Sequence, residues 1–236
     1  MKIQTKQTKR LLNLIATLGL VAWGTGYAHA QLVNGGLNAI SVGPQVLATP
    51  TGWSVTATRS ISGAFTDGAS SEPWANSSAG DPSGTFGLFF KPFQGNLTDG
   101  NLTVNLFQDN PGTPGVSYTL TGWARAEAGY SGLTDPLTTK SQFALEFLDA
   151  GSSVIGGSVL DLFTAGLGGT DSSYSVSATA PAGTVGVRSR VSMIDAYGTS
   201  GGQAFIVDAF TLVPEPSTFA LFGLGFAGLA IMRRRS

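Results

Sequence analysis

The chain has 236 residues, of which 42% are hydrophobic, only 11% are charged and 33 are glycine, a profile typical of β-rich, turn-rich domains. The absence of cysteine excludes disulfides, thiolate catalysis and zinc–thiolate sites. Residues 31–213 hold six basic and thirteen acidic side chains, a net charge of −7, which argues against nucleic acid as a partner.

The first thirty residues have the pattern of a secretory signal peptide. Four basic residues within the first ten positions precede the apolar run 11–24. Ala28 and Ala30 then supply the small side chains of a cleavage site, so we predict that signal peptidase removes residues 1–30. An uncleaved membrane anchor is the alternative, but the apolar run is short for that role.

Residues 31–212 are predicted to form one all-β domain. Apolar and polar residues alternate with period 2 in short segments, and Gly/Pro-rich turns separate the segments, as expected for a two-sheet antiparallel β-sandwich. The predicted strands lie within residues 53–61, 101–107, 116–128, 142–150, 157–165, 173–180, 184–194 and 204–212.

Aromatic and polar side chains suggest where this domain could bind a sugar. Sugars stack on flat aromatic faces and are oriented by polar groups at the edge. Trp74 lies in a polar loop, and alternation places Trp123 with Arg125 rather than with the apolar residues of its strand. Tyr130 follows in the next loop, and Arg188 and Arg190 share a strand face that could add donors. The alternative for each aromatic is packing against a sheet.

Asp208 is the candidate metal ligand. Alternation places it on the same face as the apolar residues at 204, 206, 210 and 212. A carboxylate facing a core is costly unless it is paired or binds a metal, and Ca²⁺ prefers oxygen ligands. In the alternative, Asp208 lies at a β-bulge and is hydrogen-bonded or solvated.

Several phrases, taken in order, resemble the galactose-binding-like jelly roll of carbohydrate-binding modules. They are LVNGGLN (32–38), SYTLTGWARAE (117–127), FALEFLDAGSSVI (143–155), YSVSATAPAGTVGVRSRV (174–191) and AFIVDAFTLVPEP (204–216). The resemblance implies a jelly-roll sandwich, often with a sugar-binding groove and a structural calcium. Its calcium site would pair Asp208 with the residue in the opening turn, which here is Asn38.

Enzymatic activity is not expected. The only histidine, His29, leaves with the signal peptide, so the mature domain has no imidazole base. Glycoside hydrolysis needs only two carboxylates. Glu72 and Glu127 could in principle serve, whereas Glu146 alternates opposite the apolar residues of its strand and is expected on a solvated face.

The last residues, 213–236, combine three features. Pro214, Glu215 and Pro216 form a rigid extended tripeptide, and the uncharged stretch 219–232 predicts a single apolar helix shorter than the ~20 residues of an ordinary membrane span. The basic residues that close the chain would stay on the cytoplasmic side; they are Arg233, Arg234 and Arg235.

This tail resembles the PEP-CTERM sorting signal of Gram-negative bacteria. The resemblance implies transient anchoring in the inner membrane, recognition by an exosortase, removal of the tail, and delivery to the cell surface or the exopolysaccharide matrix. An ordinary tail anchor is the alternative. We therefore expect a non-catalytic exported protein that binds extracellular polysaccharide, or else a purely structural matrix protein without a sugar site.

Overall fold

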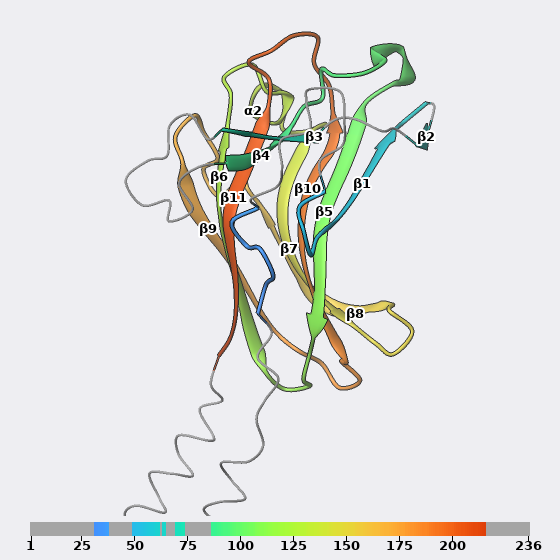
Figure 1. The fold of residues 1–236 in the computed structure, drawn as a ribbon, viewed down its shortest axis with the longest axis vertical. Coiled ribbons are helices and arrows are strands. Elements are labelled where there is room, and N and C mark those ends of the chain that lie inside the picture. The colour runs from blue at the N-terminus through green and yellow to red at the C-terminus, as the bar shows by residue number, and fades with distance from the viewer. Residues whose placement is uncertain (1–30, 38–48, 62, 65–68, 74–85, 216–236) are drawn as a thin grey trace, which may run out of the picture.

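The computed structural model describes residues 31–37, 49–61, 63–64, 69–73 and 86–215 (Figure 1). The predicted signal peptide with Ala28 and Ala30, the candidate residues Asn38 and Trp74, and the tail from Pro216 onward, with its predicted apolar helix and the terminal arginines, lie outside these residues. Among the described residues, no helix is long and apolar enough to cross a membrane.

Nearly all of the regular structure within these described ranges is β-strand. The strands are β1 (Ser54–Arg59), β2 (Gly63–Ala64), β3 (Ala69–Pro73), β4 (Phe86–Phe90), β5 (Leu102–Pro111), β6 (Ser117–Ala126), β7 (Lys140–Leu148), β8 (Val154–Asp161), β9 (Ser172–Thr179), β10 (Gly186–Ala196) and β11 (Phe205–Pro214). Two short helices accompany them in the described part of the chain, η1 (Leu97–Asp99) and α2 (Ser131–Thr134).

The strands form two antiparallel sheets, which confirms the predicted β-sandwich. One sheet has six strands in the order β2-β1-β5-β10-β7-β8, and we call it the β5 sheet. The other has five strands in the order β3-β4-β11-β6-β9, and we call it the β6 sheet. In Figure 1, β9, β6 and β11 lie on one side of the molecule and β5, β10 and β1 on the other.

Each predicted strand segment overlaps an observed strand, whereas β2, β3 and β4 were not predicted. The strand β4 lacks alternation because the sheet is buried on both faces there. Leu88 and Phe90 join the main core, and Phe89 packs on the other face with Ala204 and Ile206. A continuous apolar run of this kind carries no period-2 signal.

The core is centred on Phe210, which connects the two sheets. Its ring centroid lies 5.6 Å from that of Trp53 and 5.1 Å from that of Phe143 on β7. The strand β6 passes beside this ring at Gly122, where a Cβ atom would overlap the ring carbons of Phe210. Close packing of the aromatic core therefore requires glycine at this position.

Strand β11 reaches Phe210 through a β-bulge. Its register with β6 shifts between Asp208, opposite Trp123, and Thr211, opposite Thr121. Ala209 and Phe210 therefore face only Gly122 on β6, and Ala209 adopts a φ of 50°. The extra residue exchanges the two faces of the strand at this point.

We predict that Gly122→Ala lowers the free energy of unfolding by about 1–3 kcal/mol, because the new methyl group has to displace the Phe210 ring. Chemical denaturation of the purified protein measures this change. The control is Gly201→Ala, whose Cβ meets nothing within 4 Å and which we expect to change stability by less than about 0.5 kcal/mol. Equal stability of the two variants would contradict the packing described here.

Candidate functional site

The outer face of the β6 sheet, which points away from the core, carries Trp123. On β6 the residues 118, 120, 122, 124 and 126 are buried, whereas Trp123 and Arg125 are partly exposed on the opposite face. The predicted separation of Trp123 from the apolar residues of its strand is thus confirmed. Trp123 lies in register between Asp208 of β11 and Ser173 of β9.

Below Trp123, the outer face is lined by hydroxyl groups that pair across β6 and β9. We call these pairs the hydroxyl ladder. They are Ser117–Thr179 at 2.8 Å, Thr119–Ser177 at 2.6 Å and Thr121–Ser175 at 2.8 Å between the hydroxyl oxygens. Each hydroxyl can donate one hydrogen bond and accept others, so the paired groups keep capacity for a polar ligand.

On the other side of Trp123, the face is charged and more buried. Arg125 Nε lies 3.4 Å from Asp171 Oδ1, and the two side chains are 15% and 2% exposed. Ile206, opposite Arg125, is fully buried in the small apolar cluster with Phe89. Trp123 therefore lies where a buried part of the outer face meets the hydroxyl ladder.

Asp208 lies beside Trp123. Its surroundings match the alternative given in the sequence analysis, a hydrogen-bonded carboxylate at a β-bulge. It sits at the bulge, is 0% exposed, and its Oδ1 accepts a hydrogen bond of 2.7 Å from the main-chain N–H of Ala209. The predicted alternation holds above it for Ile206 but fails below it, because the bulge turns Phe210 into the core.

The described residues contain one of the two predicted calcium ligands, Asp208. Within them, no group of three or more His, Cys, Asp or Glu side chains could hold a metal ion. Asn38, the second predicted ligand, lies outside them, as does Trp74 of the predicted sugar site. A calcium ion at Asp208 would need oxygen ligands in addition to its carboxylate.

The prediction that Tyr130 contributes to a sugar-binding face is wrong. Its ring is 0% exposed and stacks on Phe205 in the core, with centroids 5.8 Å apart. Its hydroxyl lies 2.8 Å from Ser141 Oγ on β7. Burial raises the pKa of the Tyr130 phenol, and the Ser141 hydrogen bond opposes this shift. The sequence placed Tyr130 in a loop correctly but did not show that the loop folds inward.

Arg188 and Arg190 do not join Trp123, because β10 belongs to the β5 sheet. Arg188 makes two hydrogen bonds to Asp109, of 2.6 and 2.8 Å, and its guanidinium lies 4.5 Å from the centroid of the Phe107 ring. Arg190 binds Glu146 Oε1 at 2.6 and 3.0 Å. These arginines therefore form ion pairs on the outer face of the β5 sheet. Glu146 lies on that face as its alternation predicted, but its side chain is only 15% exposed because Arg190 covers it, so the expected solvated position is wrong.

Glu127, one candidate acid for hydrolysis, is engaged with the main chain. Its Oε2 accepts a hydrogen bond of 2.7 Å from the N–H of Ala204, next to the start of β11. Burial lowers the pKa of the neighbouring Lys91, and the charge of Glu127 opposes this shift. The hydrogen bond from Ala204 gives Glu127 a structural role in placing β11.

The sorting tripeptide begins within the fold. Pro214 is the last residue of β11 and lies opposite Tyr118 of β6. The N–H of Glu215 donates a hydrogen bond of 2.7 Å to the carbonyl oxygen of Ser117. The predicted boundary between residues 212 and 213 therefore falls inside a strand.

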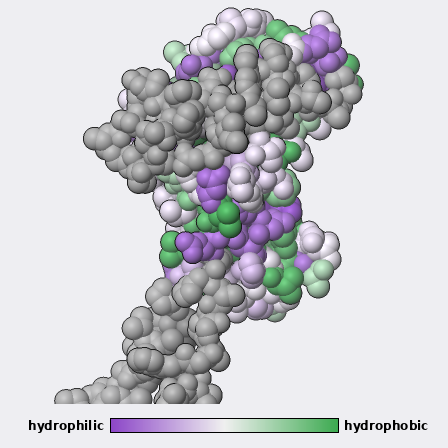
Figure 2. Space-filling view, in the orientation of Figure 1, coloured by the Kyte–Doolittle hydropathy of each residue, from purple (hydrophilic) through white to green (hydrophobic). Residues whose placement is uncertain are grey.

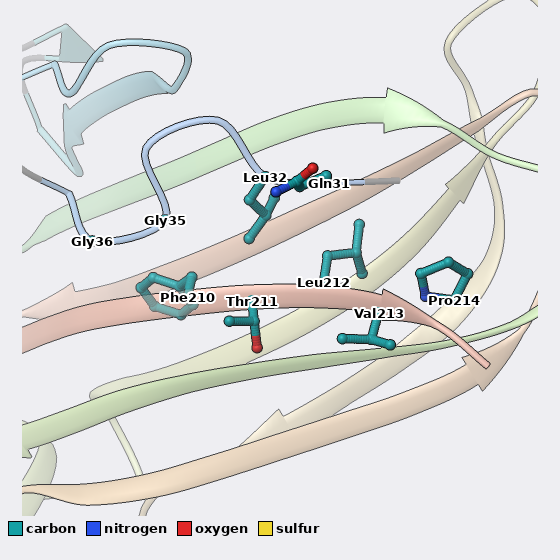
Figure 3. A pocket seen from close by; sticks show the side chains of 9 residues that line it. All are labelled: Gln31, Leu32, Gly35, Gly36, Phe210, Thr211, Leu212, Val213 and Pro214. Carbon is teal, nitrogen blue, oxygen red and sulfur yellow. The ribbon is translucent and has the colours of Figure 1, made fainter. Parts of the chain in front are cut away.

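A groove of about 520 Å³ lies between the N-terminal residues and the end of β11 (Figure 3). Gln31 and Leu32 line one side, and Val213 and Pro214 line the other. The N–H of Phe210 donates a 2.7 Å hydrogen bond to Gly35 at the inner end of the groove. The first described residues, from Gln31 onward, therefore lie beside the C-terminal half of β11.

Residues 212–235 match the family model of the PEP-CTERM protein-sorting motif. The match begins at Leu212, inside β11. Such a motif indicates export through a sorting system, with passage of a membrane. No curated protein gives a significant match to the chain.

Solved structures with a similar fold share little sequence with the chain. The Stig cyclase Fisc from Fischerella sp. TAU is 17% identical with a TM-score of 0.51, over 80% of this chain and 98% of that one. A family 16 carbohydrate-binding module is 18% identical with a TM-score of 0.42, over 62% of this chain and 85% of that one. The enzymatically active domain of bacteriophage CBA120 tailspike protein 4 is 15% identical with a TM-score of 0.48, over 76% of this chain.

The chain spans only 22% of that tailspike structure. Most of the similar structures are carbohydrate-binding modules with a β-sandwich fold, and an α-L-arabinofuranosidase is also among them. At such low identity the likeness concerns the fold alone. The chain thus carries a PEP-CTERM sorting motif at the end of a β-sandwich domain.

We predict that Tyr130→Phe lowers the free energy of unfolding by about 1–2 kcal/mol, because the buried Ser141 hydroxyl loses its partner. The control is Tyr197→Phe. The hydroxyl of Tyr197 donates to Asp135 Oδ2 at 3.1 Å on the surface, and its loss should change stability by less than about 0.5 kcal/mol. Urea denaturation compares both variants, and a reversed order of stability would contradict the assignment of Tyr130 to the core.

Proposed function

We propose that this protein is an exported, non-catalytic surface protein whose outer β6-sheet face binds extracellular polysaccharide. The observation that carries the proposal is the position of Trp123, a partly exposed indole at the end of a row of hydroxyl pairs. An aromatic face with adjacent hydroxyls is the combination that sugars require.

Different parts of this face would make different contacts with the polysaccharide. A sugar ring would stack on Trp123, and its neighbouring residues along the polysaccharide would meet the hydroxyl ladder. Arg125, held beside Asp171, would supply a charged donor next to the stacking surface. Binding would be modest, because hydroxyl groups on an exposed sheet exchange water for sugar at little net gain.

On the described part of the face shown in Figure 2, hydrophilic and hydrophobic residues are interspersed. With its net negative charge, the segment 31–213 also favours a neutral polysaccharide over a polyanion. Carbohydrate-binding modules are among the proteins of similar fold, but the proposal rests on the outer face itself.

Export would follow from the two ends of the chain. Signal peptidase would cut after Ala30, and the tail would hold the chain in the inner membrane until an exosortase removes it. The protein would then reach the surface or matrix of a Gram-negative bacterium. The presence of the PEP-CTERM motif at residues 212–235 supports this route.

A structural calcium ion at Asp208 and Asn38 remains part of the proposal. The position of Asp208 supports it: the residue is fully buried, accepts a hydrogen bond from the N–H of Ala209, and carries oxygen atoms of the kind that Ca²⁺ prefers. Asp208 and Asn38 would provide carboxylate and amide oxygens, which suit Ca²⁺. Calcium would act there as a structural clamp beside Trp123.

We predict that Trp123→Ala weakens binding to matrix polysaccharide by about tenfold, because the stacking surface is lost. Affinity electrophoresis or a pull-down with matrix polysaccharide measures the change, and circular dichroism checks the fold. The matched control is Phe163→Ala, which removes an aromatic ring that is 43% exposed after β8 and should leave binding unchanged.

Other outcomes would assign a different function. Unchanged matrix association of Trp123→Ala and Trp74→Ala would assign the purely structural role. Hydrolysis of a glycoside that is lost in Glu127→Gln or Glu72→Gln would assign a carboxylate-dependent hydrolase. The hydrogen bond between Glu127 and the main chain of Ala204 argues against the latter.

A further inference from the structure

We propose that the folded domain binds the glutamate of the sorting motif, through Ser117 and Thr119 of β6, and has to release it before the tail can be removed. The inference rests on the proposed exosortase-dependent sorting. It adds that one residue of the folded domain, Thr119, restrains the removal of the tail. Thr119 is then a positioning residue for processing rather than only part of the hydroxyl ladder.

Two contacts of different kinds hold Glu215. Its main-chain N–H donates to the carbonyl oxygen of Ser117 at 2.7 Å, which continues the pairing of β11 with β6 by one residue. Its Oε1 accepts a hydrogen bond of 2.8 Å from Thr119 Oγ1. Main chain and side chain are therefore both engaged with the same neighbouring strand.

The hydroxyl ladder strengthens the second contact. Thr119 Oγ1 also lies 2.6 Å from Ser177 Oγ. Because the single hydroxyl proton of Thr119 goes to Glu215, Ser177 has to donate in the pair with Thr119. The two hydroxyls then point in one direction, toward the carboxylate, and hydrogen bonds aligned in this way polarise one another.

Docking of Glu215 brings the domain close to the predicted membrane segment. That segment begins at Phe219, four positions after Glu215. Four extended residues span at most about 14 Å, so the end of the sandwich would lie against the bilayer. Gln31 and Leu32 occupy the same end beside Val213 and Pro214 (Figure 3). A membrane protease that reads residues 214–216 would therefore need the end of β11 to separate from β6.

Hydrogen exchange of the full chain in detergent tests the binding of Glu215 directly. Both neighbours of Glu215 are proline, so it has the only main-chain amide of residues 214–216. We expect Thr119→Val to raise the exchange rate of this amide about two- to tenfold. Thr119→Ser keeps the hydroxyl and should retain protection. The control is Thr56→Val, an exposed threonine on β1, which should leave the rate unchanged.

Pulse-chase labelling in the producing bacterium tests the consequence for processing. We expect Thr119→Val to lose its tail about two- to tenfold faster than the wild type, and Thr119→Ser and Thr56→Val to match the wild type. If Thr119→Val lost its tail at the same rate as the wild type or more slowly, the proposal that Thr119 restrains tail removal would be overturned.

The two readouts separate the possible failures. An unprotected Glu215 amide in a wild-type chain that loses its tail would overturn the binding of Glu215 and leave the sorting proposal intact. A protected amide in a wild-type chain that keeps its tail would overturn the exosortase proposal, together with the release step, while the Glu215 site would stand.

Discussion

The bulge at Ala209 and Phe210 is the constraint on which both the core and the candidate site depend. One extra residue in β11 exchanges the faces of the strand, so that Phe210 points into the core while Asp208, two positions earlier, lies beside Trp123 on the outer face. Ala209 adopts a positive φ to achieve this, and the ring of Phe210 then fills the space left by Gly122. Packing between the sheets is stable enough to offset the strain of a left-handed alanine.

The same constraint explains why the outer face changes character along its length. Above the bulge, β11 lies between β4 and β6, and its outer residues are buried with Phe89. Below the bulge, register pairs with β4 are absent from the described residues, and the N-terminal residues approach instead at Gly35. There β6 and β9 expose their hydroxyl ladder. Trp123, which is partly exposed, stands at the change from one environment to the other.

The sequence predicted the strands of the sandwich well because their alternation reflects one buried and one solvated face. It predicted the face of Trp123 for the same reason. It could not predict β4, since both faces of that strand are covered. It offered the bulge at Asp208 only as an alternative, since alternation alone does not show where a strand takes an extra residue. The sequence also gave no sign that β9 supplies half of the hydroxyl ladder, because strand pairing is a non-local property. Tyr130 was misjudged on similar grounds, since only the fold shows that its loop closes over the core.

Strand β11 connects what would otherwise be two separate functions. Its middle carries Asp208 beside Trp123, and its end leads into the sorting motif, where Glu215 binds the hydroxyl of Thr119 in the middle pair of the hydroxyl ladder. In the proposed route, the carboxylate of Glu215 would occupy the Thr119 hydroxyl before processing, and a polysaccharide would use that hydroxyl afterwards. Any release of this strand end for the protease would thus also uncover part of the proposed binding face. In the proposed route, this shared hydrogen bond would set the order of the two events, so that a chain still attached to the inner membrane would offer a shorter face to its ligand than the exported protein would.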